Sequence, residues 1–519
     1  MSKNIFLIYS VMLLMGFMIM NGASPSYGND ASKAAAESIE IMPVQDAGFI
    51  RSGITFAENH LAAITGRTTH KRQKALPLIL ELLAQPEKRQ TMPLLKIQHP
   101  DLGELYGSKW ISLETYRDPV KMNRLSGMLQ RNQNLMRIVQ ELEVSAQRIE
   151  ELDKDFAIIA PEDAASPDAE WLSPARMRET LENTGRDADP KVEAILEHWD
   201  KLRAAIGANN VDEARQIGEE MAAEVEELAI TRGAELPNLK LDAFYHDWDP
   251  FKVGALFYLF ATLVYLASLV FKKKRLAWGG IALLIAGLFF QSIGIAARWI
   301  ISGRAPLSNM YESYTFAVAG FVLVAIIFEW IYHMRLVGFG AALLGFTLMI
   351  LAHNAPIFDS KITPLMPALQ SSWLTYHVVT IMLSYSAFLL SFFTCIVYLV
   401  KDIGGGNDSR FALLRQAPSL ETLERVNYKI IAVGFPLLTL GIVLGAVWAN
   451  TAWGRPWGWD PKETWSAITW LVYAAYLHVR YLSGWRGRGS IILSIIGFAC
   501  VLFTYFGVNY LLSGLHSYA

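Results

Sequence analysis

The pattern of hydrophobic and polar residues changes near residue 250. Before this point, apolar residues recur at helical spacing between charged ones, as in 176–183 and 212–228, which predicts amphipathic helices. After it, apolar runs of about 18 to 25 residues follow one another, and each is long enough to cross ~30 Å of hydrocarbon. The pattern predicts eight membrane spans, at 253–271, 278–301, 314–332, 336–355, 375–400, 427–449, 466–482 and 490–512.

The first 28 residues follow a different pattern. Lys3 precedes an apolar stretch from Ile5 to Met20, and small residues follow as far as Ser26. This is typical of a secretory signal peptide, and an uncleaved anchor is the alternative. The predicted domains are a signal peptide or N-terminal anchor at 1–28, a mainly helical extracytoplasmic domain at 29–250 and a membrane domain at 251–519. The predicted fold class is all-α, a polytopic helical membrane protein.

Positive charges predict the orientation of the membrane domain. Lys and Arg cluster at 272–275, 333–335, 401–429 and 480–488. If the 29–250 domain lies outside, all four clusters fall on the inner side of the membrane. The outer side then receives the segments 302–313, 354–372, 450–465 and 513–519, which hold most of the candidate chemistry.

Composition excludes several other classes of function. The net charge of −2 gives no reason to expect a nucleic-acid partner. The two cysteines, Cys395 and Cys500, both lie in apolar runs, and the sequence has no CxxC motif, so neither a zinc site nor a covalent haem attachment site is predicted. We expect these cysteines to be packing residues. The isolated histidines of the extracytoplasmic domain are expected on its surface: His60, His70, His99 and His198.

Tryptophans are concentrated between the sixth and seventh predicted spans. The loop 448–465 contains five of the chain's 15 tryptophans. Part of it is explained as a helix start, with Asp460 as N-cap, Pro461 at the first helical position and Glu463 reaching back to the cap. That does not explain the tryptophans before the cap, because anchoring at a membrane interface needs only one or two aromatic residues per helix end. A cluster of flat rings suits a large flat ligand such as a porphyrin.

The sequence WGRPWGWDPKETW at 453–465 resembles the tryptophan-rich WWD signature of haem-handling proteins in cytochrome c maturation. Its DPKETW ending is the form typical of the CcsA family. The segment Ser308–Ser313 is similar to the "SN.YES" outer loop of that family, and the resemblance covers about 250–519. It implies that the chain binds haem b, with contributions from Trp453, Trp457, Trp459, Asp460 and Trp465.

Two histidines are candidate outer ligands of the haem iron. His377 lies at the outer start of the fifth span, four residues after Trp373 and on the same helix face. His516 follows the last span. Neutral imidazole is a usual iron ligand, so two histidines beside the tryptophan loop predict a bis-imidazole site. In the CcsA family the histidines in the matching contexts are the external axial ligands, and His353 is a spare candidate.

His478 is a candidate for a second, inner haem site. It lies ~20 Å deeper than Trp465 along the same predicted helix. An ionisable side chain inside the bilayer is a functional-site hypothesis by default. The resemblance implies an inner haem site here, whose second ligand comes from a CcsB/ResB-like membrane subunit. His333 is the alternative second ligand, although the simpler interpretation is that it anchors the helix end at the membrane interface.

The resemblance implies a function in cytochrome c maturation at the bacterial inner membrane. The chain would present haem on the periplasmic side and, with the CcsB/ResB-like partner, promote thioether attachment to apocytochrome c as part of a holocytochrome c synthase. A thioredoxin-like thiol reductant is a further implied partner. Arg304, Arg455 and Lys462 are outer cations that could pair with the haem propionates. The alternatives are a haem exporter that supplies a separate ligase and a haem-bearing electron-transfer subunit.

Overall fold

The computed structural model describes residues 29–132, 134–166, 168–185, 187–332, 334–355, 357–362, 365, 369–406, 417–512 and 514. The chain divides between Trp248 and Asp249 into two compact units, each of which is described by itself. The predicted signal peptide or anchor at 1–28, the predicted ligand His516 and the alternative ligand His333 lie outside the described residues.

The N-terminal unit is mainly helical and has one principal hydrophobic core. Its central helices are α2 (Asp30–Ile39), α3 (Gly53–Thr65), α4 (Ala75–Ala84), α12 (Pro190–Ala208) and α13 (Val211–Thr231). The predicted amphipathic helices correspond to α13 and α11 (Pro174–Thr184). The remaining helices are α5 (Pro86–Thr91), α6 (Pro100–Tyr106), α7 (Leu113–Tyr116), α8 (Pro119–Arg131), α9 (Asn134–Glu150), α10 (Leu152–Asp155) and α14 (Leu239–Trp248).

The N-terminal unit also contains three two-stranded antiparallel sheets, which the all-α prediction missed. They pair β1 (Pro43–Asp46) with β2 (Phe49–Ser52), β3 (Thr69–His70) with β4 (Gln73–Lys74), and β5 (Leu95–Lys96) with β6 (Trp110–Ile111). Strands of two to four residues are too short to establish an alternating pattern that can be told from a loop.

The prediction that the histidines of this unit lie on the surface was wrong for two of them. His60 and His70 are buried. His60 Nδ1 lies 3.0 Å from the carbonyl oxygen of Phe56, one turn earlier in α3. Burial lowers the pKa of His70, because desolvation disfavours the charged imidazolium. Polar neighbours in the sequence did not predict exposure here, because His60 lies on the buried face of α3 and His70 faces inward from the short strand β3.

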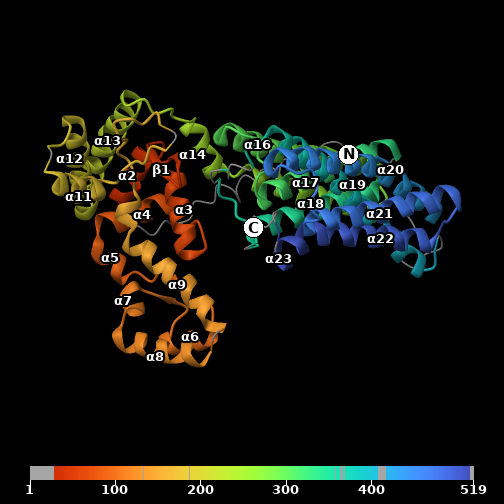
Figure 1. Cartoon of the computed structure of the whole chain (residues 1–519), viewed down its shortest axis with the longest axis horizontal. Coiled ribbons are helices and arrows are strands. Elements are labelled where there is room, and N and C mark those ends of the chain that lie inside the picture. Colours follow the sequence, from red (N-terminus) through yellow and green to blue (C-terminus); the bar gives the residue numbers. More distant parts are fainter. Residues whose placement is uncertain are drawn as a thin grey trace. The chain divides into compact units, whose positions relative to one another are not determined.

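The membrane unit is a bundle of long helices (Figure 1, green to blue). They are α15 (Pro250–Val270), α16 (Lys274–Ser302), α17 (Met310–Tyr332), α18 (Arg335–Asn354), α19 (Ser372–Ile403), α20 (Leu420–Trp453), α21 (Pro461–Leu482) and α22 (Arg488–Leu502), which continues through a π-helical turn, η4 (Phe503–Gly507), into α23 (Val508–Leu511). Within the described ranges, seven helices are long and apolar enough to cross a membrane. The chain is therefore a polytopic helical membrane protein.

The seventh predicted span is a helix, but a less apolar one. The predicted segment 466–482 lies in α21, which is not among the seven. It packs against α20 and α22 and buries Tyr473 and Tyr476. Its other faces carry polar residues such as Thr464, His478 and Arg480, which lower its mean hydropathy. The crossing of the membrane by α21 stays a prediction.

Helices α19 and α20 pack closely because glycines lie between them. A Cβ atom at Gly434 of α20 would lie 2.9 Å from the Phe388 ring, and one at Gly441 would lie 2.5 Å from Ile381. One turn further, a Cβ at Gly445 would lie 2.7 Å from the imidazole of His377. Small residues let membrane helices approach this closely. This packing presses His377 against the backbone of α20.

Candidate functional site

The connections 303–309 and 454–460 and the described residues of the connection after α18 meet at one end of the membrane unit, which we call the tryptophan end. Asn309 donates a hydrogen bond to the carbonyl oxygen of Lys361 over 3.2 Å, and Gly514 packs against Asp460. A cavity of about 200 Å³ opens here between α17, α19, α20, α21 and η4. Its walls include Leu307, Ser308, Met310, His377, Ile381, Tyr385, Gly445, Trp448, Trp457, Lys462, Glu463, Thr504 and Tyr505.

His377 is held in a defined orientation at this cavity. Its Nδ1 lies 2.7 Å from the carbonyl oxygen of Gly441. A carbonyl only accepts hydrogen bonds, so Nδ1 is the donor in this contact, and in the neutral imidazole Nε2 then carries the lone pair. This is the tautomer that a metal-ligating imidazole uses, with its other nitrogen bonded to a backbone carbonyl. The imidazole lies parallel to the Trp448 ring, with centroids 6.3 Å apart and an interplanar angle of 11°.

The tryptophan loop is shorter than the predicted 448–465. Helix α20 continues to Trp453, so Trp448 and Trp453 lie on its last turns, with ring centroids 4.8 Å apart. The connection between α20 and α21 is therefore only Gly454–Asp460. In this connection the rings of Trp457 and Trp459 lie 5.8 Å apart at 87°, edge to face.

Trp459 has an unusual backbone and an unusual exposure. Its φ of 57° lies in the left-handed region, which is strained for a bulky residue. Its side chain is also 74% exposed, despite its size. Strained backbone is concentrated at ligand-binding and catalytic sites, where the surrounding structure holds it. The conformation turns the chain into α21 and leaves most of the indole exposed among the described residues.

The N-terminus of α21 is fixed by the predicted capping box. Asp460 accepts a hydrogen bond from the backbone N–H of Lys462 over 2.9 Å. Glu463 accepts one from the N–H of Asp460 over 3.2 Å and another from the N–H of Gly458 over 2.7 Å. Asp460 is 7% exposed. These contacts hold the loop that carries Trp457 and Trp459.

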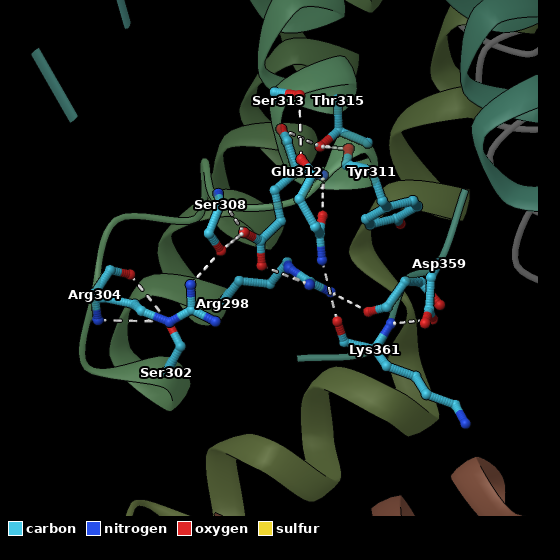
Figure 2. A network of polar contacts seen from close by, with 12 residues as sticks. Arg298, Ser302, Arg304, Ser308, Tyr311, Glu312, Ser313, Thr315, Asp359 and Lys361 are labelled. Carbon is cyan, nitrogen blue, oxygen red and sulfur yellow. Dashed lines mark hydrogen bonds and ion pairs between the residues drawn. The ribbon is translucent and has the colours of Figure 1, made fainter. Parts of the chain in front are cut away.

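The three predicted propionate partners have different surroundings. Lys462 precedes the predicted span 466–482, lines the cavity and donates a hydrogen bond to Asn509 over 3.0 Å. Burial lowers the pKa of Lys462 to about 8, although the nearby Asp460 carboxylate opposes this shift. Arg304 donates to the hydroxyl of Ser308, and burial lowers its pKa as well (Figure 2). Arg455 packs over Gly458.

Comparison with known proteins decides the family. The family model described as cytochrome C assembly protein matches residues 307–516. The chain is 41% identical over 280 residues to the cytochrome c biogenesis protein CcsA of Guillardia theta, covering 50% of this chain and 92% of that protein. It is 38% identical over 318 residues to CcsA of Porphyra purpurea, covering 54% of this chain and 99% of that protein. This chain belongs to the CcsA family. Its role therefore lies in cytochrome c biogenesis, and the predicted resemblance is confirmed.

Within this CcsA-family chain, the structure brings part of the predicted site together. His377, Trp457 and Lys462 line one cavity, and Trp453 is linked to it through Trp448. Trp465 turns instead to Phe503, with ring centroids 4.1 Å apart.

Two other histidines of the described membrane unit, His478 and His353, do not line the cavity. His478 is exposed on the surface of α21, ~24 Å along the helix from Lys462. His353, the spare ligand, lies 3.9 Å from Asp249 and does not line the cavity.

The sequence analysis missed one side of the cavity. The π-helical turn η4 interrupts α22 and places Thr504 and Tyr505 in the wall. The hydroxyl groups of Tyr505 and Ser313 lie 2.8 Å apart and join η4 to α17. Single-turn π-helices frequently occur at functional sites. The turn lies within an apolar run that is long enough to span a membrane. The only signals in the sequence that could have indicated it are the polar residues Thr504 and Asn509.

Proposed function

We propose that this chain binds haem b at the tryptophan end and presents it on the outer face of the membrane for attachment to apocytochrome c. The observation that carries the proposal is the orientation of His377. Its Nδ1 proton is bound by the Gly441 carbonyl, and the ring stands at a cavity walled by Trp448 and Trp457. Membership of the CcsA family supports the same function.

The residues of the cavity fit the parts of a haem. His377 would supply one nitrogen ligand to the iron, and His516 is the proposed second ligand. The apolar side chains Ile381 and Ile442 and the Trp457 ring suit the porphyrin faces. Lys462 offers a cation to a propionate. The cavity of about 200 Å³ is small for a porphyrin, so part of the haem would lie outside it.

The attachment reaction needs little chemistry from this chain. Each cysteine of the apocytochrome CxxCH motif adds its S–H across a haem vinyl group; sulfur bonds to one vinyl carbon, the proton goes to the other, and no electrons are gained or lost. The chain contributes proximity and orientation, which together lower the barrier. A thioredoxin-like thiol reductant would keep the cysteines reduced beforehand.

The proposed inner site needs a partner. His478 is exposed on α21, so a ligand from another membrane subunit can reach it. We propose that a CcsB/ResB-like subunit supplies this ligand and that the two chains together form a holocytochrome c synthase. The proposed location is the bacterial inner membrane, with the N-terminal unit and the tryptophan end on the periplasmic side, in agreement with the positions of the Lys and Arg clusters.

The test is reconstitution in bacterial cells that lack cytochrome c maturation. The chain is expressed with an apocytochrome c reporter, with and without a CcsB-like partner, and covalent haem is detected after denaturing electrophoresis. We expect covalent haem only when both subunits are present. His377→Gly should lower the yield at least tenfold and weaken a six-coordinate low-spin haem b spectrum, and added imidazole should restore part of both.

His353→Gly is the matched control, because His353 lies outside the cavity. An unchanged spectrum and yield in His377→Gly would remove this histidine as a ligand. If haem reaches the outer face but is joined to the reporter only after a separate ligase is added, the exporter alternative is correct.

A further inference from the structure

A buried ion pair lies behind one wall of the cavity. Arg298 of α16 and Glu312 of α17 are each 1% exposed, and Arg298 Nη2 lies 2.8 Å from Glu312 Oε1 (Figure 2). Removing two charges from water is costly, and a pair of apolar residues would often be as stable or more so. Such a pair therefore needs an explanation beyond stability.

The second oxygen of Glu312 holds the backbone of the cavity wall. Glu312 Oε2 accepts hydrogen bonds from the backbone N–H of Ser308 over 2.9 Å and from the Ser308 hydroxyl over 2.8 Å. The N–H of Glu312 donates to the side chain of Asn309 over 2.8 Å. Residues Leu307–Met310 form the cavity wall contributed by this loop. Glu312 thus fixes the wall through three hydrogen bonds.

Arg298 connects the same wall to the next loop. Its Nη1 donates to the carbonyl oxygen of Ser360 over 2.8 Å, while Nη2 binds Glu312. Asn309 donates to the neighbouring carbonyl of Lys361 over 3.2 Å. The guanidinium carbon also lies 5.2 Å above the Tyr311 ring. This one buried ion pair therefore links α16, the start of α17 and the segment that follows α18.

We propose that Arg298 and Glu312 are positioning residues of the cavity: they fix the Leu307–Met310 wall, and through it they set how a haem lies against His377. This inference rests on the proposed function. The pair does not touch the ligand in this proposal. A fixed wall would limit how a haem lies against the imidazole, and the burial and distortion of a haem are among the factors that tune the reduction potential of its iron.

The experiment replaces the pair as a unit. Removing one partner leaves an uncompensated buried charge and can prevent folding, whereas replacing both with apolar residues is tolerated. The variant is therefore Arg298→Met with Glu312→Leu in the full chain, co-expressed with the partner subunit. We expect protein abundance within about twofold of wild type, but haem affinity reduced about tenfold, with a shifted reduction potential and a changed low-spin electron paramagnetic resonance spectrum.

The matched control is another buried carboxylate on the same helix. Glu329 accepts a hydrogen bond from Tyr265 over 2.6 Å, ~25 Å along α17 from Glu312. Tyr265→Phe with Glu329→Leu should leave the spectrum and potential unchanged. Ser308→Ala removes the hydroxyl's hydrogen bonds to Glu312 and from Arg304 but keeps the backbone hydrogen bond to Glu312, and it should shift the same spectral features by a smaller amount than the double variant.

A second readout does not depend on haem. In a chain with Cys395→Ala and Cys500→Ala, the alkylation rate of a Leu307→Cys variant measures how accessible the cavity wall is. This rate should rise at least tenfold when Arg298 and Glu312 are both replaced. An unchanged alkylation rate, or a wild-type spectrum and potential at normal abundance, would overturn the positioning role. If the wild-type chain binds no haem while the alkylation rate still rises, the proposed function fails and only the fixing of the wall stands.

Discussion

At the scale of single residues, the position of His377 depends on a residue with no side chain. The imidazole fills the space that a Cβ atom would occupy at Gly445, one turn after the Gly441 carbonyl that binds its Nδ1 proton. Both contacts come from the backbone of α20. The sequence identifies His377 as a candidate ligand, but it does not show that Gly441 and Gly445 orient its ring.

Gly445→Ala should therefore disturb the ligand without removing it. The added Cβ would lie 2.7 Å from Cε1 and Nδ1 of His377, and the ring must shift. We expect haem affinity to fall at least tenfold, or ~1.4 kcal/mol, with a broadened low-spin spectrum measured in detergent-purified protein.

Gly434→Ala is the matched control for helix spacing, because its Cβ would meet the Phe388 ring rather than the imidazole. Equal losses in both variants would show that the separation of α19 and α20, rather than contact with His377, sets the affinity.

At the scale of elements, the start of α21 combines two roles that the sequence alone does not separate. The capping box explains Asp460 and Glu463 as a helix start. The same hydrogen bonds also hold Gly458, between Trp457 and Trp459, and so support the strained backbone of Trp459. A cap at this position stabilises both the helix and the aromatic loop.

Substitution of Asp460 separates capping from a direct role of its charge. Asp460→Ala should cost ~1 kcal/mol of helix stability, seen as faster hydrogen exchange at 461–465, and haem loading should fall. Asp460→Asn keeps a capping oxygen but removes the charge, so both the exchange rate and the haem loading should stay near wild type. Loss of loading in the Asn variant at unchanged exchange would instead assign the carboxylate to the binding site.

At the scale of the whole molecule, the two proposed haem sites lie at different depths of α21. His478 and the cavity are separated by ~24 Å along the helix, and His478 points out of the bundle. A ligand that entered at His478 would have to pass along the surface of α21, between this chain and its proposed partner, to reach the tryptophan end.

His478→Ala should therefore lower haem occupancy of the outer site severalfold when the partner is co-expressed, because the supply is interrupted. Leu471→Ala is the matched control, two helical turns away on an exposed position of the same helix, and should leave the occupancy unchanged. His333→Ala should also have little effect. Normal loading in His478→Ala would mean that haem reaches the outer face by another route, and full loss in His333→Ala would mean that this chain builds its inner site alone.

Sequence alone was sufficient wherever a property belongs to consecutive residues. Apolar runs predicted the long helices of the membrane unit, since the length of a hydrophobic segment and the thickness of a bilayer are directly comparable. The Asp-Pro-Lys-Glu tetrad predicted the start of α21, because a capping box involves only neighbouring residues. The motif 453–465 identified the family. The assignment of α21 as a span depends instead on the summed polarity of a long segment. Its polar residues leave α21 outside the seven apolar helices, so the apolar run alone does not decide whether it crosses the membrane.

Only the tertiary structure decided which of these residues share a site. It placed His377, Trp457 and Lys462 around one cavity, turned Trp465 away to Phe503, and left His478 on the bundle surface. It also added parts with little mark in the sequence: the π-helical turn at Phe503–Gly507, the glycines beside His377 and the Arg298–Glu312 pair. The reason is physical, because side-chain direction and close approach depend on how distant helices rotate and pack against one another, and the local pattern of one helix does not contain that information.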